Sequence, residues 1–259
     1  MNAISTAIAL LLLTAFTAGP GLAAEKPDGT ARAKEILNKV DDMWRGKSSR
    51  AILTMKVQTA NYTRAMSLEG WSKGKGMSLV RVTYPLKEKG TATLKTGPVI
   101  YTYLPKTDKT IRLTSGMMSG SWMGSHLTND DLVKESRLTE DFTAVVTFEG
   151  QRDGAYAMDF SLTPKPDSAV VWGKITMTLH VEGNDYLPVT EVFYDEELKP
   201  ARTIVFMDIK TFAGRRLPAV MKVTPADKPG EFTELVYQSL DFEIPLDDSF
   251  FSISQLRRD

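Results

Sequence analysis

Residues 51–68 read AILTMKVQTANYTRAMSL, and this stretch decides the fold. Apolar and polar side chains alternate along it, as they do in a strand with one buried face. The apolar face of its first half carries Ala51, Leu53, Met55 and Val57. Asn61 lies at a turn, after which Met66 and Leu68 resume the apolar pattern. The stretch therefore predicts a β-hairpin that covers a core with one of its faces.

Similar segments follow along most of the chain. We expect further strands at residues 77–84, 91–95, 99–104, 111–113, 142–148, 156–162, 172–181, 188–194, 202–211, 219–224 and 232–237. Turn residues separate these segments at the spacing of an antiparallel sheet or barrel, and nothing indicates alternating strands and helices. The chain is long enough to build one large β domain with a substantial core.

One helix is expected before the strands, at residues 31–44. Thr30 is a plausible N-cap for it, and Gly46 is a natural stop. Its apolar side chains recur at helical spacing and are Ala33, Ile36, Leu37, Val40, Met43 and Trp44. Such a stripe must be buried, and the sheet is the expected partner.

Residues 116–132, GMMSGSWMGSHLTNDDL, form a flexible, apolar stretch. Its large side chains are Met117, Met118, Trp122 and Met123. Thr128 can cap a short helix, with Asp131 as its capping-box partner. Methionine adapts to variable apolar shapes. The stretch is therefore interpreted as a cover over an apolar site. The sequence leaves open whether it is a moving gate or a plug in which Trp122 sits permanently inside the barrel.

The first 24 residues have the composition of a secretory signal peptide. An apolar run at residues 8–16 precedes a Gly-Pro-Gly turn and the small residues Ala23 and Ala24. That run is too short to span a bilayer, which takes about 20 residues. The chain has no cysteine, which excludes disulfides and the lipid-bearing N-terminal cysteine of bacterial lipoproteins. We expect residues 25–259 to form a single domain in the periplasm that is not lipid-anchored.

Composition and spacing argue against several function classes. Basic and acidic residues balance at 32 each, so bulk charge does not recruit nucleic acid or an anionic membrane. The lysines between residues 73 and 95 are expected on a solvated face, with docking on an acidic partner as the alternative. Asp130 and Asp131 lack the spacing of a calcium loop and suit a helix start.

The two histidines do not indicate catalysis or a metal site. A serine hydrolase that used Ser125 and His126 would need a nucleophile elbow, and no G-x-S-x-G motif surrounds this serine. His126 is therefore expected to be a solvated loop residue, and His180 a surface residue of a strand. Together they share no spacing of a metal site. We expect no catalytic residue, no metal and no cofactor.

The chain ends with IPLDDSFFSISQL at residues 244–256. Phe250 and Phe251 would lie exposed unless this segment packs on the sheet. Docking is therefore favoured over a loose tail.

Several segments together resemble the outer-membrane lipoprotein-sorting protein family of LolA- and LolB-like periplasmic carriers. They are the exported start, the helix at 31–44, SWMGSHLTNDDL at 121–132, LPVTEVFYDEELKP at 187–200, RRLPAVMKV at 215–223 and the C-terminal segment. The resemblance implies a mainly β fold with α elements. The expected architecture is an incomplete antiparallel β-barrel, or half-barrel, that encloses or is covered by short helices. It also implies an arginine near the cavity that holds the lid, for which Arg64 and Arg81 are candidates.

The resemblance implies a periplasmic carrier or chaperone that binds acyl chains of lipoproteins or lipids for transfer toward the outer membrane. An alternative is a lipid- or lipoprotein-sensing accessory protein of a membrane exporter. Expected partners are acyl chains and an inner-membrane transporter of the ABC or RND type, and the protein is expected to be a monomer. The residues expected to line the cavity and its lid are Leu53, Met55, Met66, Leu68, Tyr101, Tyr103, Met117, Met118, Trp122, Met123, Leu127, Met177 and Phe206.

Overall fold

The computed structural model describes residues 29–134, 138–168 and 170–258, so the predicted signal peptide at residues 1–24 lies outside the described residues. The helices are α1 (Gly29–Asp41), α2 (Asn129–Lys134), α3 (Leu138–Asp141) and α4 (Ile253–Leu256). The strands are β1 (Ser48–Gln58), β2 (Thr63–Lys73), β3 (Met77–Tyr84), β4 (Ala92–Thr96), β5 (Val99–Leu104), β6 (Lys109–Arg112), β7 (Phe142–Arg152), β8 (Ala155–Pro164), β9 (Lys174–Glu182), β10 (Asp185–Tyr194), β11 (Pro200–Phe212), β12 (Arg215–Pro225) and β13 (Phe232–Phe242).

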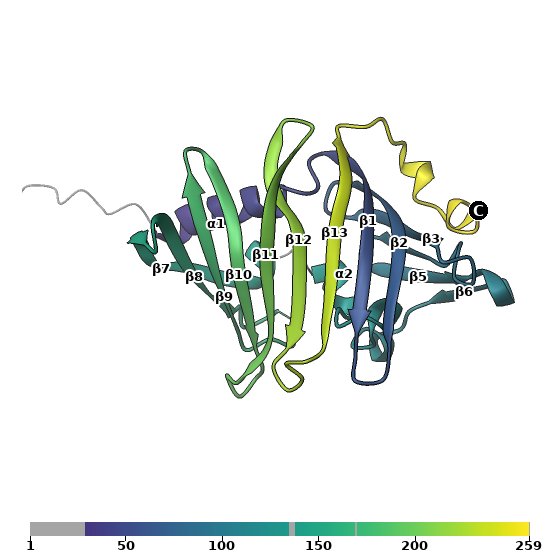
Figure 1. The fold of residues 1–259 in the computed structure, drawn as a ribbon, viewed down its shortest axis with the longest axis horizontal. Coiled ribbons are helices and arrows are strands. Elements are labelled where there is room, and N and C mark those ends of the chain that lie inside the picture. Colours follow the sequence, from purple (N-terminus) through teal and green to yellow (C-terminus); the bar gives the residue numbers. More distant parts are fainter. Residues whose placement is uncertain (1–28, 135–137, 169, 259) are drawn as a thin grey trace, which may run out of the picture.

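These strands form one antiparallel sheet that does not close (Figure 1). Its order is β6-β5-β4-β3-β2-β1-β13-β12-β11-β10-β9-β8-β7, so almost every strand pairs with its neighbours in sequence. The exception is the pairing of β1 with β13, which joins the two halves of the sheet. The predicted half-barrel with short helices is confirmed.

The opening hairpin forms as its alternation predicts. In β1 and β2, Met55 lies opposite Met66 and Leu53 lies opposite Leu68. All four side chains are buried on one face, while the residues between them are exposed or half-buried. Cross-strand apolar pairs of this kind stabilise the register, because a slip by one residue would turn the whole apolar face toward solvent.

The connection from β6 to β7 follows from the strand order. These two strands are the edges of the sheet, and residues 113–141 join them. The connection must therefore pass from one edge of the curved sheet to the other. It contains the Trp122 turn (Trp122–Gly124), α2 and α3, and it lies on the same face of the sheet as α1. In Figure 1 both α1 and α2 lie behind the strands.

Helix α1 buries its apolar stripe on the half of the sheet formed by β7 to β12. Ala33, Ile36, Leu37 and Val40 are buried there, as the spacing predicts, and they pack against Phe160 and its neighbours. The helix is shorter than expected. It starts at Gly29, so Thr30 lies inside its first turn and is not the N-cap, and it ends at Asp41. None of the described helices is long and apolar enough to cross a membrane.

The C-terminal segment covers the opposite face of β3, β4 and β5, which confirms the predicted docking. Phe251 and Leu256 are buried there against Leu79 and Leu94. Arg81 donates from Nη2 to the Gln255 carbonyl at 2.7 Å. Since the Trp122 stretch covers the other face, β4 is buried on both faces, and its first four residues show no alternation of burial.

The lysines between residues 73 and 95 were expected on a solvated face, and this is wrong for part of the group. Lys95 is buried, and its Nζ donates to the Lys75 carbonyl at 2.8 Å. Lys73 bonds Asp248 at 2.6 Å and so holds the C-terminal segment. Lys87 and Lys89 are exposed as expected. Alternation alone cannot show that a second layer covers the outer face.

Candidate ligand cavity

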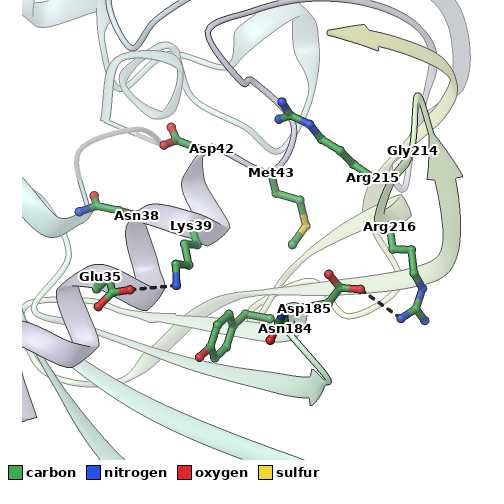
Figure 2. A pocket seen from close by; sticks show the side chains of 11 residues that line it. Glu35, Asn38, Lys39, Asp42, Met43, Asn184, Asp185, Gly214, Arg215 and Arg216 are labelled. Atoms are coloured by element: carbon green, nitrogen blue, oxygen red, sulfur yellow. Dashed lines mark hydrogen bonds and ion pairs between the residues drawn. The ribbon is translucent and has the colours of Figure 1, made fainter.

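A recess lies on the outside of the protein, between α1 and the β9–β10 and β11–β12 turns. It measures about 620 Å³, and Figure 2 shows its lining side chains. Four of its charged groups form pairs: Lys39 with Glu35 at 2.9 Å, and Arg216 with Asp185 at 3.2 Å. A surface lined by paired charges offers little for an apolar ligand to bury against.

A second hollow lies inside, between the sheet and the elements that cover it, and measures about 230 Å³. The apolar side chains that line it are Val40, Trp44, Leu53, Val80, Trp122, Leu127, Leu132, Leu138, Phe142, Val170, Trp172, Ile175, Met177, Phe193, Ile204, Phe206, Met221, Leu235 and Tyr237. The charged ones are Asp41, Arg45, Asp131, Glu191 and Arg202. Pockets for drug-sized ligands typically measure about 300–1,000 Å³, so this cavity is smaller than a typical ligand pocket.

The structure distributes the predicted cavity residues over four places. Those that line the inner cavity are Leu53, Trp122, Leu127, Met177 and Phe206. Met55, Met66 and Leu68 are fully buried in the core that supports Trp122, and Met123 packs on that core. Tyr101 and Tyr103 lie with the C-terminal segment on the other face of the sheet, away from the cavity. Met117 is exposed and Met118 half-buried, and neither lines the cavity.

Trp122 occupies the position of a plug. It is 5% exposed, and its indole N–H donates to Thr93 Oγ1 of β4 at 3.1 Å. The backbone beside it is fixed as well. Tyr62 donates its hydroxyl to the Gly124 carbonyl, and Arg64 donates Nη1 to the Met123 carbonyl, both at 3.0 Å. Strands β2 and β4 and the β1–β2 turn therefore hold this turn against the sheet.

His126 continues this attachment and is not the solvated residue that was expected. Its backbone N–H and its Nδ1 both lie 2.9 Å from Thr233 Oγ1, and its Nε2 lies 3.1 Å from Glu231 Oε2. The backbone N–H of Ala60 and the His126 ring together hold the pKa of the Glu231 carboxyl below its ordinary value. Hydrogen bonds to distant strands explain the burial, and local sequence gave no sign of them. His180 lies on the half-buried outer side of β9, as predicted.

Helix α2 begins with the predicted capping box. The Thr128 backbone N–H donates to Asp131 Oδ2 at 2.7 Å, and the Asp131 N–H donates to Thr128 Oγ1 at 3.2 Å. Each side chain thus satisfies a backbone donor that the first turn of a helix leaves free.

Asp131 also forms a two-pronged ion pair with Arg202 of β11. Arg202 Nη1 and Nη2 donate to the two carboxylate oxygens at 2.6 and 2.7 Å. Burial would raise the pKa of Asp131, but the hydrogen bonds and charge of Arg202, helped by Thr128, more than offset this and lower it. The pair attaches α2 to the sheet inside the cavity.

Two arginines bond the covering segment, and the sequence analysis named one of them as a candidate. Arg64 does contact the cover at Met123, but Arg81 lies on the other face of the sheet and bonds the C-terminal segment. Arg202 shares a strand face with Ile204 and Phe206, all of which line the cavity. The signal available in the sequence was a charged residue, Arg202, on the same strand face as the apolar residues Ile204 and Phe206.

The fold is similar to that of solved structures described as outer membrane lipoprotein-sorting and LolA superfamily proteins. A DUF1329 family protein from Desulfovibrio piger matches with a TM-score of 0.77 and 20% identity over 88% of this chain and 99% of that chain. A protein described as an outer membrane lipoprotein-sorting protein domain from Vibrio parahaemolyticus matches with 0.74 and 23% over 88% and 100%. A LolA superfamily protein from Nitrosomonas europaea matches with 0.71 and 21% over 86% and 98%.

A family model described as "uncharacterized protein" matches residues 74–258, and the chain belongs to that family. No curated protein matches the sequence.

The position of Trp122 predicts a structural role. Trp122→Ala removes a buried ring and its hydrogen bond, and should lower the free energy of unfolding by about 3–5 kcal/mol. The control is Met117→Ala in the same stretch, where the side chain is 41% exposed and a change within about 0.5 kcal/mol is expected. Denaturant unfolding measures both. Equal stability of the two variants would show that Trp122 is a gate.

The Asp131–Arg202 pair predicts a pH dependence. The pKa of Asp131 in the fold lies below its ordinary value of 3.8, so the pair stabilises the fold above that pH and is lost as the pH falls through the lower, folded pKa. Asp131→Asn should cost about 3–5 kcal/mol near neutral pH, because Arg202 stays buried without its counter-ion.

This difference from wild type should shrink toward zero in acid, where Asp131 is protonated as well. Denaturant unfolding over a pH series provides the measurement. Asp130→Asn, which changes the neighbouring helix-start acid, should cost about 1 kcal/mol or less. A cost of Asp131→Asn that stayed constant into acid would contradict the role of the ionised pair.

Proposed function

We propose that this protein is a carrier that binds acyl chains of lipoproteins or other lipids in the inner cavity. The observation that carries the proposal is an enclosed, mainly apolar cavity between a curved sheet and a covering segment. Burial of an acyl chain stabilises the complex by about 0.8 kcal/mol per methylene and requires no catalytic group. Within the described residues, no group of three or more acidic or histidine side chains is placed to hold a metal.

The relatives support a lipid cargo. The Vibrio parahaemolyticus protein is described as an outer membrane lipoprotein-sorting protein domain, and it shares the fold over most of both chains. An apolar cavity in this position gives that description a physical basis in the present chain. Lipid transfer, and not lipid chemistry, is the activity that such a site favours.

Loading requires the cavity to grow. A long acyl chain exceeds about 230 Å³, so a covering element must move outward. The Trp122 turn is held by side chains from β2, β4 and the β1–β2 turn, whereas the sheet holds α2 by the Asp131–Arg202 pair and by apolar contacts of Leu132. We propose that α2 is the moving part. A closed α2 shields the cargo, and an open one releases it.

The composition of residues 1–24 supports export to the periplasm, where such a carrier would receive its cargo from an inner-membrane transporter. The intact mass of the mature protein tests this proposal, since cleavage after Ala23 or Ala24 gives a defined mass. A mature protein that retained residues 1–24 would contradict it.

Filling the cavity should block the cargo. Leu53→Phe adds bulk at the sheet side of the cavity and should weaken binding of a fluorescent fatty acid about tenfold, which corresponds to the loss of about two buried methylenes. The matched control is Ile52→Phe, because the neighbouring side chain points to the other face and is 39% exposed.

Fluorescence titration measures both variants against wild type, and mass spectrometry of lipid extracted from the natively purified protein gives a second measurement. Bound lipid in the wild type and its reduction in Leu53→Phe are the expected results. A wild-type protein that carries no lipid and takes up no fatty acid would refute the carrier.

A further inference from the structure

Arg202 is a buried charge held in a fixed orientation. The residue is 6% exposed, and its guanidinium carbon lies 4.2 Å from the centre of the Phe193 ring and 4.8 Å from that of Trp172. Aromatic faces attract a cation but accept no strong hydrogen bond, so they position the guanidinium without satisfying its N–H groups. The planar donor fork is thus already oriented inside an apolar cavity.

The hydrogen bonds of Arg202 to Asp131 leave its Nε without a partner. Among the interactions of the described residues, the carboxylate bonded to Arg202 is that of Asp131, on α2. The buried Nε has no hydrogen-bond partner there. Native proteins rarely leave a buried donor unpaired, and Arg202 lines the cavity, so an acceptor bound there could reach this donor.

Movement of α2 would remove the carboxylate from Arg202. A guanidinium left alone in an apolar cavity is strongly unfavourable, because burying an unpaired charge costs far more free energy than burying a neutral polar group. A wholly neutral lipid would therefore have to open α2 against this cost. A ligand with its own acid group would replace the lost carboxylate and could also bond Nε.

We propose that the cavity selects single-chain amphiphiles with an acidic head group, and that this acid takes the place of Asp131 on Arg202. This inference rests on the proposed function and specifies its cargo. Carboxylates and phosphates share the required chemistry, since both accept two parallel hydrogen bonds from a guanidinium. Exchange of one acid for another couples occupancy of the cavity to release of α2.

Asp41, another acid of the lining, does not oppose this exchange through Arg202. Its carboxylate lies 3.9 Å from Lys75 Nζ and so has a cation of its own. A cationic or uncharged head group would leave Arg202 without a counter-ion once α2 had moved.

Three ligands with the same twelve-carbon chain test the proposal: dodecanoate, dodecyl phosphate and dodecanol. Binding to the mature wild-type protein at neutral pH is measured by calorimetry. We expect at least one acid to bind about tenfold more tightly than the alcohol. The two acids distinguish a fatty acid from a phosphate head group. Equal binding of all three ligands would overturn the inference and leave the carrier intact.

Variants locate the preference. Arg202→Met combined with Asp131→Leu replaces the ion pair by apolar groups of similar volume, which proteins commonly tolerate. This double variant should bind dodecanol within about threefold of wild type and should bind the acids no better than the alcohol. The matched control is Arg216→Met combined with Asp185→Leu, which removes the outer pair of Figure 2 and should leave all three affinities unchanged.

Two outcomes count against the proposal. Retention of the acid preference in the Arg202/Asp131 double variant would place the head group elsewhere. Failure of all three ligands, dodecanol included, to bind the wild type would refute the carrier as well. Asp131→Asn gives a second measurement that does not depend on the double variant: with the competing charge removed, the ratio of acid to alcohol affinity should rise.

Discussion

The pairing of β1 with β13 is the constraint on which the rest of the structure depends. It joins Met55 to Leu235 across the middle of the sheet and makes β6 and β7 the two edges. Residues 113–141, which connect these edges, must then cross the open side of the half-barrel. The covering segment and the cavity beneath it are consequences of strand order. Without this pairing, the same segment would be an ordinary loop between two strands that lie side by side in the sheet.

The connection has two parts that are held by different forces. The Trp122 turn is fixed by the indole bond to Thr93 and by side-chain donors from β2 and the β1–β2 turn, and the following His126 N–H donates to Thr233 of β13. Helix α2 is short, and its attachment to the sheet depends on one ion pair and on apolar contacts. Elements with few anchoring contacts are the ones that open at low free-energy cost. A rigid half of the cover next to a releasable half suits a cavity that must exchange its contents.

The Asp131–Arg202 pair is better explained by specificity than by stability. A buried ion pair loses much of its attraction to desolvation, and apolar side chains of similar volume often serve the fold equally well. Here the pair sits where a lipid would lie, with Arg202 braced by Phe193 and Trp172. The fold keeps a charge in that place despite the free-energy cost of desolvation, which is consistent with recognition of a polar head group.

The sequence alone determined what depends on neighbours in the chain. Alternation gave the β1–β2 hairpin and its buried face, helical spacing gave the stripe of α1, and Thr128 with Asp131 gave the start of α2. These follow because periodicity and capping act over a few residues. Tertiary structure decided which apolar residues meet: Leu53 and Trp122 line the cavity, while Tyr101 and Tyr103 pack under the C-terminal segment. It also brought Arg202 to Asp131 from 71 positions away. No local pattern encodes such a contact, because it depends on the register of strands that pair only when the whole sheet forms.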